Sequence, residues 1–131
     1  TNLPIWHIVL WLTHDRTHNG IGSIFYATSS GNEPVREWLK KLPKKDMRTI
    51  GFDIKTVQYG YPIGMPLTRV LHGTDGLEEV RCNISNGIAR VIFYVGDNTM
   101  VLLHAFIKKT QETPKKELDV AIKRYKELSK R

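Results

Sequence analysis

The sequence predicts an α+β domain: an antiparallel sheet of about four to five strands, with a helix hairpin on one face and a further helix at the C-terminus. Three strand-like runs follow one another at 77–84, 88–95 and 99–107, separated by short turns that contain Gly and Asn. Two amphipathic helical patterns precede these runs, and one follows them. At 131 residues with a hydrophobic fraction of 40%, the chain suits one domain with one core.

The elements before the three runs are a strand and two helices. A strand at 22–28 ends in a Ser-Ser-Gly turn, and Asn32 and Pro34 then favour the start of a helix. Its apolar stripe consists of Val35, Trp38, Leu39 and Leu42. A second helix at 44–59 follows Pro43 and buries Met47, Ile50, Ile54 and Val57. We therefore expect a helix hairpin that covers one face of the sheet.

The remaining elements frame the three runs. A short strand at 67–71 precedes them, and we expect His72, in the turn after it, to be exposed. After the runs, Thr113 and Pro114 favour the start of a last helix. Its apolar positions follow helical spacing: Leu118, Ala121, Ile122, Tyr125 and Leu128.

Alternation along the three runs predicts two unlike faces, because successive residues of a strand point to opposite sides. One face is apolar, and we expect it to bury Cys82 as a small hydrophobic residue. The other face carries Arg81, Arg90, Tyr94 and His104, and we expect it to face a cleft or a partner. In the third run, strict alternation groups Met100, Leu102, His104 and Phe106 on one side.

The charge of the chain points to a polyanionic partner. A net charge of +7 favours nucleic acid first, and an acidic protein or a membrane surface second. The single cysteine gives no sign of an oxidising compartment. No apolar run is long enough to span a membrane. We therefore expect a cytoplasmic protein with no membrane association.

Residues 1–22 are predicted to be an N-terminal extension to which the sequence assigns no role. Its apolar run at 3–12 is too short to span a membrane and lacks the flanks of a signal peptide. His14 and His18 are spaced as metal ligands on a helix often are, but no acidic or cysteine partner lies at ligand spacing. We expect no metal and no cofactor.

The polar face suggests chemistry on RNA. Arg81 and Arg90 can hold a phosphodiester, because a guanidinium offers paired donors and keeps its charge. Tyr94 and Phe106 can stack on unpaired bases. The ribose 2′-hydroxyl can attack the adjacent phosphorus without a metal if side chains move protons, and candidates for this are His104, Lys108 and Lys109. A lone histidine in a strand is also often structural, and a tyrosine often packs in a core.

Four segments resemble one family. The wording VREWL at 35–39, LEEVR at 77–81, ARVIFY at 89–94 and above all VLLHAFIKKTQETPKK at 101–116 is similar to the RelE superfamily of bacterial toxins. The similarity is greatest to its phage-derived, HigB-like branch. It covers about residues 24–128, whereas the extension has no place in the family pattern.

This resemblance implies a ribosome-dependent mRNA interferase that cleaves mRNA in the ribosomal decoding site by 2′-hydroxyl attack. It also implies an antitoxin, in this branch usually a helix-turn-helix protein. By position, Arg90 matches the arginine of the central strand, and Arg81 matches the basic residue of the preceding strand. Further catalytic side chains are expected at His104, Lys108 and Lys109. The C-terminal tyrosine or histidine of some members has no clear counterpart, so the acid and base roles stay open.

The sequence therefore predicts one toxin-like domain at 23–131 after the extension at 1–22. Its predicted catalytic residues are Arg90, His104, Lys108 and Lys109, and its RNA-binding residues are Arg81, Tyr94, Phe106, Lys115 and Lys116. One alternative is a basic RNA- or ribosome-binding module without catalysis, which would need the charge but not His104. A second is a regulatory protein whose extension blocks the active face or makes an oligomer contact.

Overall fold

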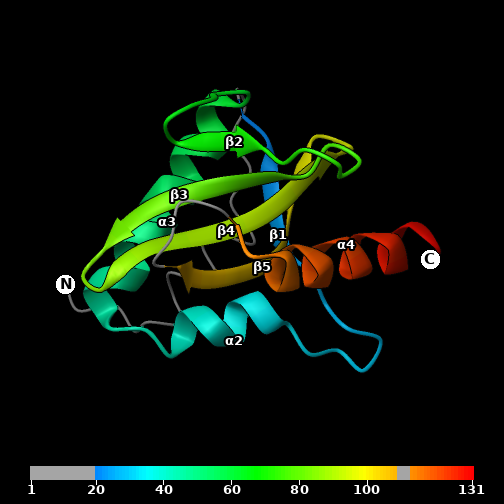
Figure 1. Cartoon of the computed structure of the whole chain (residues 1–131), viewed down its shortest axis with the longest axis horizontal. Helices are drawn as coiled ribbons and strands as arrows, with labels where there is room; N and C mark the ends of the chain where they lie inside the picture. The colour runs from blue at the N-terminus through cyan, green and yellow to red at the C-terminus, as the bar shows by residue number, and fades with distance from the viewer. Residues whose placement is uncertain (1–19, 109–112) are drawn as a thin grey trace.

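The computed structural model describes residues 20–108 and 113–131 and contains a five-stranded sheet with three helices (Figure 1). The strands are β1 (Gly22–Phe25), β2 (Thr68–Val70), β3 (Glu78–Ile84), β4 (Gly87–Gly96) and β5 (Thr99–Lys108). The helices are α2 (Pro34–Lys40), α3 (Lys44–Gly60) and α4 (Lys115–Ser129). The predicted α+β class is confirmed, and every predicted element after the extension is present.

The sheet is mixed rather than purely antiparallel. Its strand order is β1-β5-β4-β3-β2, and the pairs β5-β4, β4-β3 and β3-β2 are antiparallel. β1 instead pairs parallel with β5, in a register that joins Gly22 to Thr99. The prediction of an antiparallel sheet was wrong at this edge. The helix pair carries the chain from β1 at one edge to β2 at the other.

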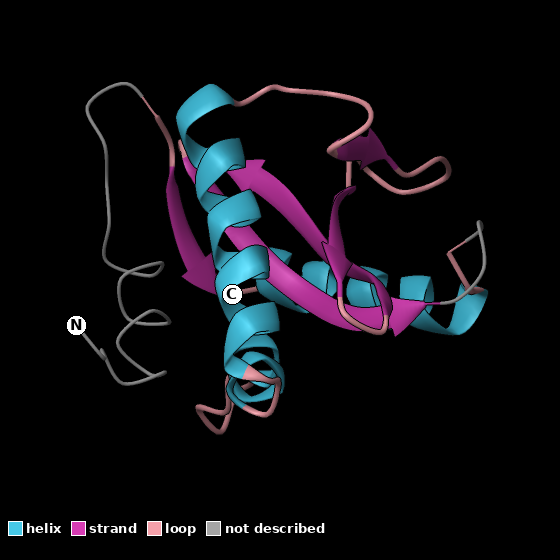
Figure 2. Ribbon diagram, turned by 90° about the vertical axis from the view of Figure 1, so that its left-hand side faces the viewer, coloured by secondary structure: helices cyan, strands magenta, loops and turns pink. Residues whose placement is uncertain are grey.

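The helix pair covers one face of the sheet, as predicted. Figure 2 shows α3 lying across that face, and Val35 and Leu39 of α2 are buried beside it. The core on this side takes the inward residues of the central strands: Val80, Cys82, Ala89, Val91 and Phe93. Cys82 is fully buried, which confirms its predicted place in the core, and His72 is exposed as expected.

The opposite face is partly covered by α4. A second apolar cluster forms there between the sheet and the helix, and includes Leu77, Ile92, Leu103, Phe106 and Ala121. The face predicted to look into a cleft or a partner is therefore divided in two. One part packs under α4, and the other holds a group of charged side chains near the start of that helix.

A β-bulge in β5 changes which residues share a face. Ile92 of β4 pairs with His104, but the next residue, Phe93, pairs with Leu102, so Leu103 is skipped. Met100 and Leu102 consequently point into the core below α2 and α3, whereas Leu103 lies in the cluster under α4. The strict alternation predicted for this strand was wrong, because it assumed a regular ladder across the bulge.

The predicted extension lies mostly outside the described residues, and so do His14 and His18. The description begins at residue 20. The backbone N–H of Ile21 donates to Gln58 O of α3 at 2.9 Å, and the Gln58 side-chain amide donates back to Ile21 O at 3.1 Å. Among the described residues, no helix has the length and apolar character needed to cross a membrane.

Candidate functional site

Four basic side chains come together on the α4 face, one from each of four neighbouring strands. These are Arg69 of β2, Arg81 of β3, Arg90 of β4 and Lys108 of β5, here called the cationic cluster. The strand register brings them together, since Arg81 pairs directly with Arg90 and Arg69 pairs with Glu79. Each of the three arginines lowers the pKa of Lys108, so all four groups interact electrostatically.

Glu79 lies at the centre of the cationic cluster and is fully buried. Its Oε1 forms ion pairs with Arg90 Nη1 and with Arg69 Nη2, the latter at 2.9 Å. Its Oε2 accepts a hydrogen bond from Thr113 Oγ1 at 2.9 Å, which links the start of α4 to the sheet. Four cationic groups thus surround one carboxylate within the described part of the chain, and the excess positive charge suits an anionic ligand.

Arg90 is the most deeply buried member of the cationic cluster. Its side chain is 1% exposed, and burial lowers its pKa while the neighbouring Glu79 carboxylate raises it. The Nε atoms of Arg81 and Arg90 are buried and have no hydrogen-bond partner among the described residues. Buried donors are normally hydrogen-bonded, so these two N–H groups are available to a ligand or to water.

Lys108 is suited to proton transfer near neutral pH. It is 5% exposed, and its pKa is lowered to about 8, first by burial and then by the positive charge of the arginines. The Glu79 carboxylate opposes this effect only in part. Lys108 therefore exchanges between charged and neutral forms in a pH range where an ordinary lysine stays charged.

His104 lies between the sheet and α4. Its Nε2 is 2.8 Å from Glu117 Oε1, and Arg124 Nη1 donates to its Nδ1 at 3.3 Å. Arg124 also donates to Leu103 O at 2.8 Å. Burial lowers the pKa of His104, which favours the neutral ring with a proton on Nε2. Both ring nitrogens are thus engaged in holding α4 on the sheet.

We expect His104→Ala to lower the free energy of unfolding by about 1–3 kcal/mol, because Glu117 and Arg124 lose a partner at a half-buried position. Urea denaturation measures this effect. Exposed His72→Ala is the matched control and should change little. Unchanged stability in His104→Ala would show that the histidine does not hold the helix.

The two predicted stacking residues pack against other rings, and of the two only Phe106 is buried. Tyr94 packs edge-on against Tyr125 of α4, with ring centroids 4.8 Å apart. Phe106 is 6% exposed, and its ring stacks on His104 at 5.6 Å. A base could reach the Phe106 ring only if α4 or its side chains moved.

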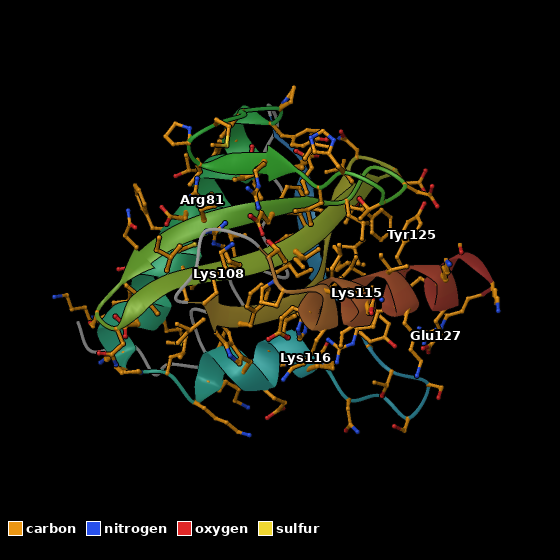
Figure 3. All side chains as sticks on the ribbon, viewed as in Figure 1. Arg81, Lys108, Lys115, Lys116, Tyr125 and Glu127 are labelled. Carbon is orange, nitrogen blue, oxygen red and sulfur yellow. The ribbon has the colours of Figure 1, made fainter. Side chains whose placement is uncertain are left out.

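Two further predicted residues, Lys115 and Lys116, are exposed on the first turn of α4. Figure 3 shows Arg81, Lys108 and Lys115 on the side of the sheet on which α4 begins. Lys115 also lies 3.5 Å from Asp119, one helical turn along. Lys109 falls outside the described residues. Positive charge therefore extends from the cationic cluster onto the exposed start of the helix.

Arg69, Glu79 and Thr113 were not predicted from the sequence as site residues. One signal was present, because Glu79 alternates with Arg81 along the same strand and must share its face. A carboxylate on a face crowded with arginines indicates a buried ion pair. No signal existed for Arg69 or Thr113, since their contacts depend on how β2 and the start of α4 meet β3.

The sheet with a helix pair on one face and a C-terminal helix on the other is consistent with a RelE-like small domain. The family model for phage derived protein Gp49-like (DUF891) matches residues 37–126, about two thirds of the chain, and the chain belongs to this family. The family is part of the RelE/ParE-like toxin superfamily of toxin-antitoxin systems, which implies an antitoxin partner. No curated protein matches the chain.

Proposed function

We propose that this protein is a ribosome-dependent mRNA interferase of the HigB-like branch, which acts in the cytoplasm and is neutralised by a helix-turn-helix antitoxin. The observation that carries the proposal is the cationic cluster, in which three arginines and Lys108 surround one buried carboxylate. Membership of a toxin superfamily supports the same reading. The cluster matches the charge of an RNA phosphodiester and the chemistry that cleaves it.

In this proposal the cleavage needs only the RNA and protein side chains. Neutral Lys108 removes the proton of the ribose 2′-hydroxyl, and the 2′-oxygen attacks the adjacent phosphorus. The bond from phosphorus to the 5′-oxygen breaks, and that oxygen takes up one proton. Lys109, the next residue along the chain, is our candidate for its donor. The products are a 2′,3′-cyclic phosphate and a free 5′-hydroxyl.

The arginines stabilise the phosphorane transition state in this scheme. Arg81 contacts one phosphate oxygen with its guanidinium, and Arg90 supplies positive charge from its buried position in the sheet. Lys115 and Lys116 attract the neighbouring mRNA backbone at the surface. His104 is assigned a positioning role, because its ring nitrogens are bonded to Glu117 and Arg124. Tyr94 is assigned to packing for the same kind of reason.

The proposal is tested by inducing the protein in cells and mapping the ends of cellular transcripts. We expect growth arrest and cuts within translated codons that leave 2′,3′-cyclic ends. Arg81→Ala should reduce cleavage by about 100-fold or more, since one positioned donor to the transition state is lost. Arg81 is partly exposed, so its replacement disturbs the core little. Lys40→Ala, which removes an exposed charge on α2, is the matched control and should cleave normally.

Intact transcripts, together with purified protein that still binds ribosomes, would remove the nuclease function. The remaining reading would then be a basic ribosome-binding module on the same fold. Growth arrest that survives Arg81→Ala would point in the same direction.

A further inference from the structure

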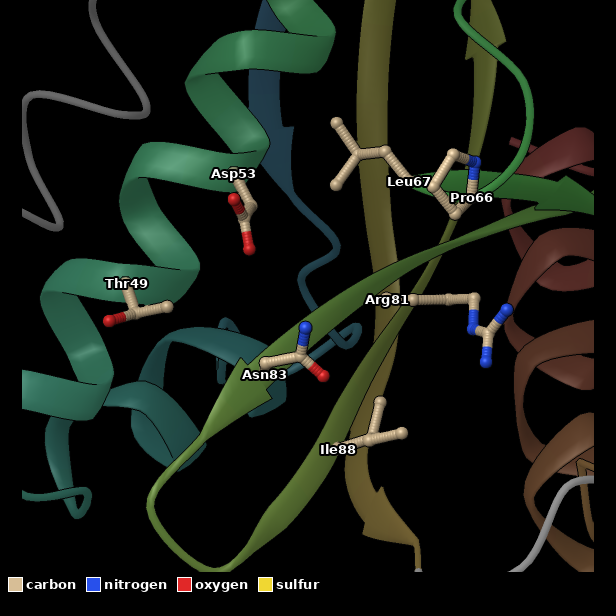
Figure 4. A pocket seen from close by; sticks show the side chains of 7 residues that line it. All are labelled: Thr49, Asp53, Pro66, Leu67, Arg81, Asn83 and Ile88. Atoms are coloured by element: carbon tan, nitrogen blue, oxygen red, sulfur yellow. The ribbon is translucent and has the colours of Figure 1, made fainter.

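A cleft of about 440 Å³ opens at the edge of β3, beside the cationic cluster (Figure 4). It exists because β2 is short and pairs only with Glu78–Val80 of β3. The last backbone bond between them runs from Arg81 N–H to Leu67 O at 2.8 Å. Beyond this bond, the described sheet has no strand beside β3 on the edge that faces away from β4. The cleft therefore crosses the free edge of the sheet.

The two sides of the cleft carry opposite charges. Figure 4 shows Asp53 and Thr49 of α3 on one side of β3, with Arg81 extending from the other. Asp53 has no cationic partner among the described residues, and its carboxylate accepts a hydrogen bond from the Cys82 thiol. Burial raises the pKa of Asp53. A half-buried carboxylate without a cation is unusual in a chain of charge +7, and such groups concentrate at binding sites.

The remaining walls combine apolar and amide surfaces. Leu67 and Ile88 contribute aliphatic surface, and the exposed side chain of Asn83 lies between the two charged groups. The volume is within the range of pockets that hold small organic ligands, roughly 300–1,000 Å³. A cation, a carboxylate and apolar walls in one cleft match a nucleotide, in which a phosphate is joined to a flat base with N–H donors.

We propose that this cleft binds the nucleoside next to the cleaved phosphodiester and prefers guanine. Arg81 contacts the phosphate, Leu67 and Ile88 flank the base, and the Asp53 carboxylate accepts hydrogen bonds from its edge. This inference rests on the proposed function, because the nucleoside is taken to be part of the RNA substrate.

Guanine follows from the donor pattern of the bases. Its N1–H and N2–H groups are parallel and match the two oxygens of a carboxylate. Adenine and cytosine each place one amino group beside an acceptor nitrogen, which a carboxylate repels, and uracil has one N–H between two carbonyl oxygens. A site built around a carboxylate therefore favours guanine and leaves the other bases with an unpaired or repulsive contact.

The test uses the full-length protein and four 2′-O-methyl trinucleotides with G, A, C or U at the central position. These cannot be cleaved by 2′-hydroxyl attack, so binding is measured without ribosomes and without catalysis. Titrations followed by NMR should show the Asn83 amide signals shifting most strongly with the G trinucleotide. We expect that trinucleotide to bind about tenfold more tightly than the other three, as one bidentate contact to a base typically gives.

Three variants make the test specific. Asp53→Asn should abolish the preference for G, whereas Asp75→Asn, which removes an exposed carboxylate elsewhere, should keep it. Asn83→Ala should weaken binding of the G trinucleotide without affecting the fold, because the side chain is exposed.

Equal binding of all four trinucleotides, or a G preference that survives Asp53→Asn, would overturn the inference. The two proposals fail separately. If transcripts are cleaved but Asp53 selects no base, the proposed nuclease function is retained and the proposed guanine site is rejected. If the protein prefers G but cleaves no transcript, the guanine site is retained and the nuclease function is rejected.

Discussion

Replacing Glu79 by alanine should lower the free energy of unfolding by about 3–5 kcal/mol, a large share of the stability of a small domain. Glu79 is fully buried, and Arg90, its main partner, is 1% exposed. Without the carboxylate, the guanidinium of Arg90 stays in the interior with no opposite charge. Arg69 is about one-third exposed and can turn to water, so most of the effect comes from Arg90. Chemical denaturation monitored by circular dichroism measures this loss.

Two further variants separate the charge from the packing. Glu37→Ala removes an exposed carboxylate of α2 and should change stability by less than about 0.5 kcal/mol. The double variant Glu79→Met with Arg90→Met should regain most of the stability lost in Glu79→Ala, because apolar side chains often replace a buried ion pair at little cost. A stable Glu79→Ala protein would show that Arg90 does not need the carboxylate in the folded state.

The second large effect concerns Lys108 and the pH dependence of cleavage. Because its pKa is lowered to about 8, the neutral amine is the minor form below that pH. As the proposed general base it acts only when neutral. The single-turnover rate on programmed ribosomes should therefore rise about tenfold per pH unit below pH 8 and level off above it.

Lys108→Arg keeps the charge but removes the neutral form, since a guanidinium stays protonated at these pH values. We expect its rate to fall by about 100-fold or more, with no levelling near pH 8. Lys40→Arg makes the same chemical change at an exposed position on α2 and should keep the wild-type profile. A wild-type rate that falls above pH 8 would mean that Lys108 donates the proton, and the assignment as base would be wrong.

The elements of this fold were predictable because their signals are local. The turns at 85–86 and 97–98 lie between the strands, within the turn segments expected from the sequence, and Pro34, Pro43 and Pro114 lie at the helix starts. What the sequence did not reveal was non-local. The parallel pairing of β1 depends on which edge of the sheet is left open after the helix pair crosses it.

The same distinction holds for the candidate site. Arg81 and Arg90 were predictable as neighbours, because alternation and a two-strand hairpin place them on one face. The bulge at Leu103 was not predictable, since nothing in the run VLLHAF marks one residue as skipped. The hydrogen bond from Thr113 to Glu79 also escaped prediction, because it forms only when α4 has packed on the sheet.

The pairing of β1 with β5 determines how much of the chain must be synthesised before the sheet can form. More than half of the chain separates the two strands, so β1 leaves the ribosome long before its partner exists. Such distant pairing forms late, because the intervening chain must first lose its freedom. Arg69, Arg81 and Arg90 likewise lack their neighbours Lys108 and Thr113 until those residues have been synthesised. A growing chain therefore has no complete cationic cluster until Lys108 and Thr113 have been synthesised.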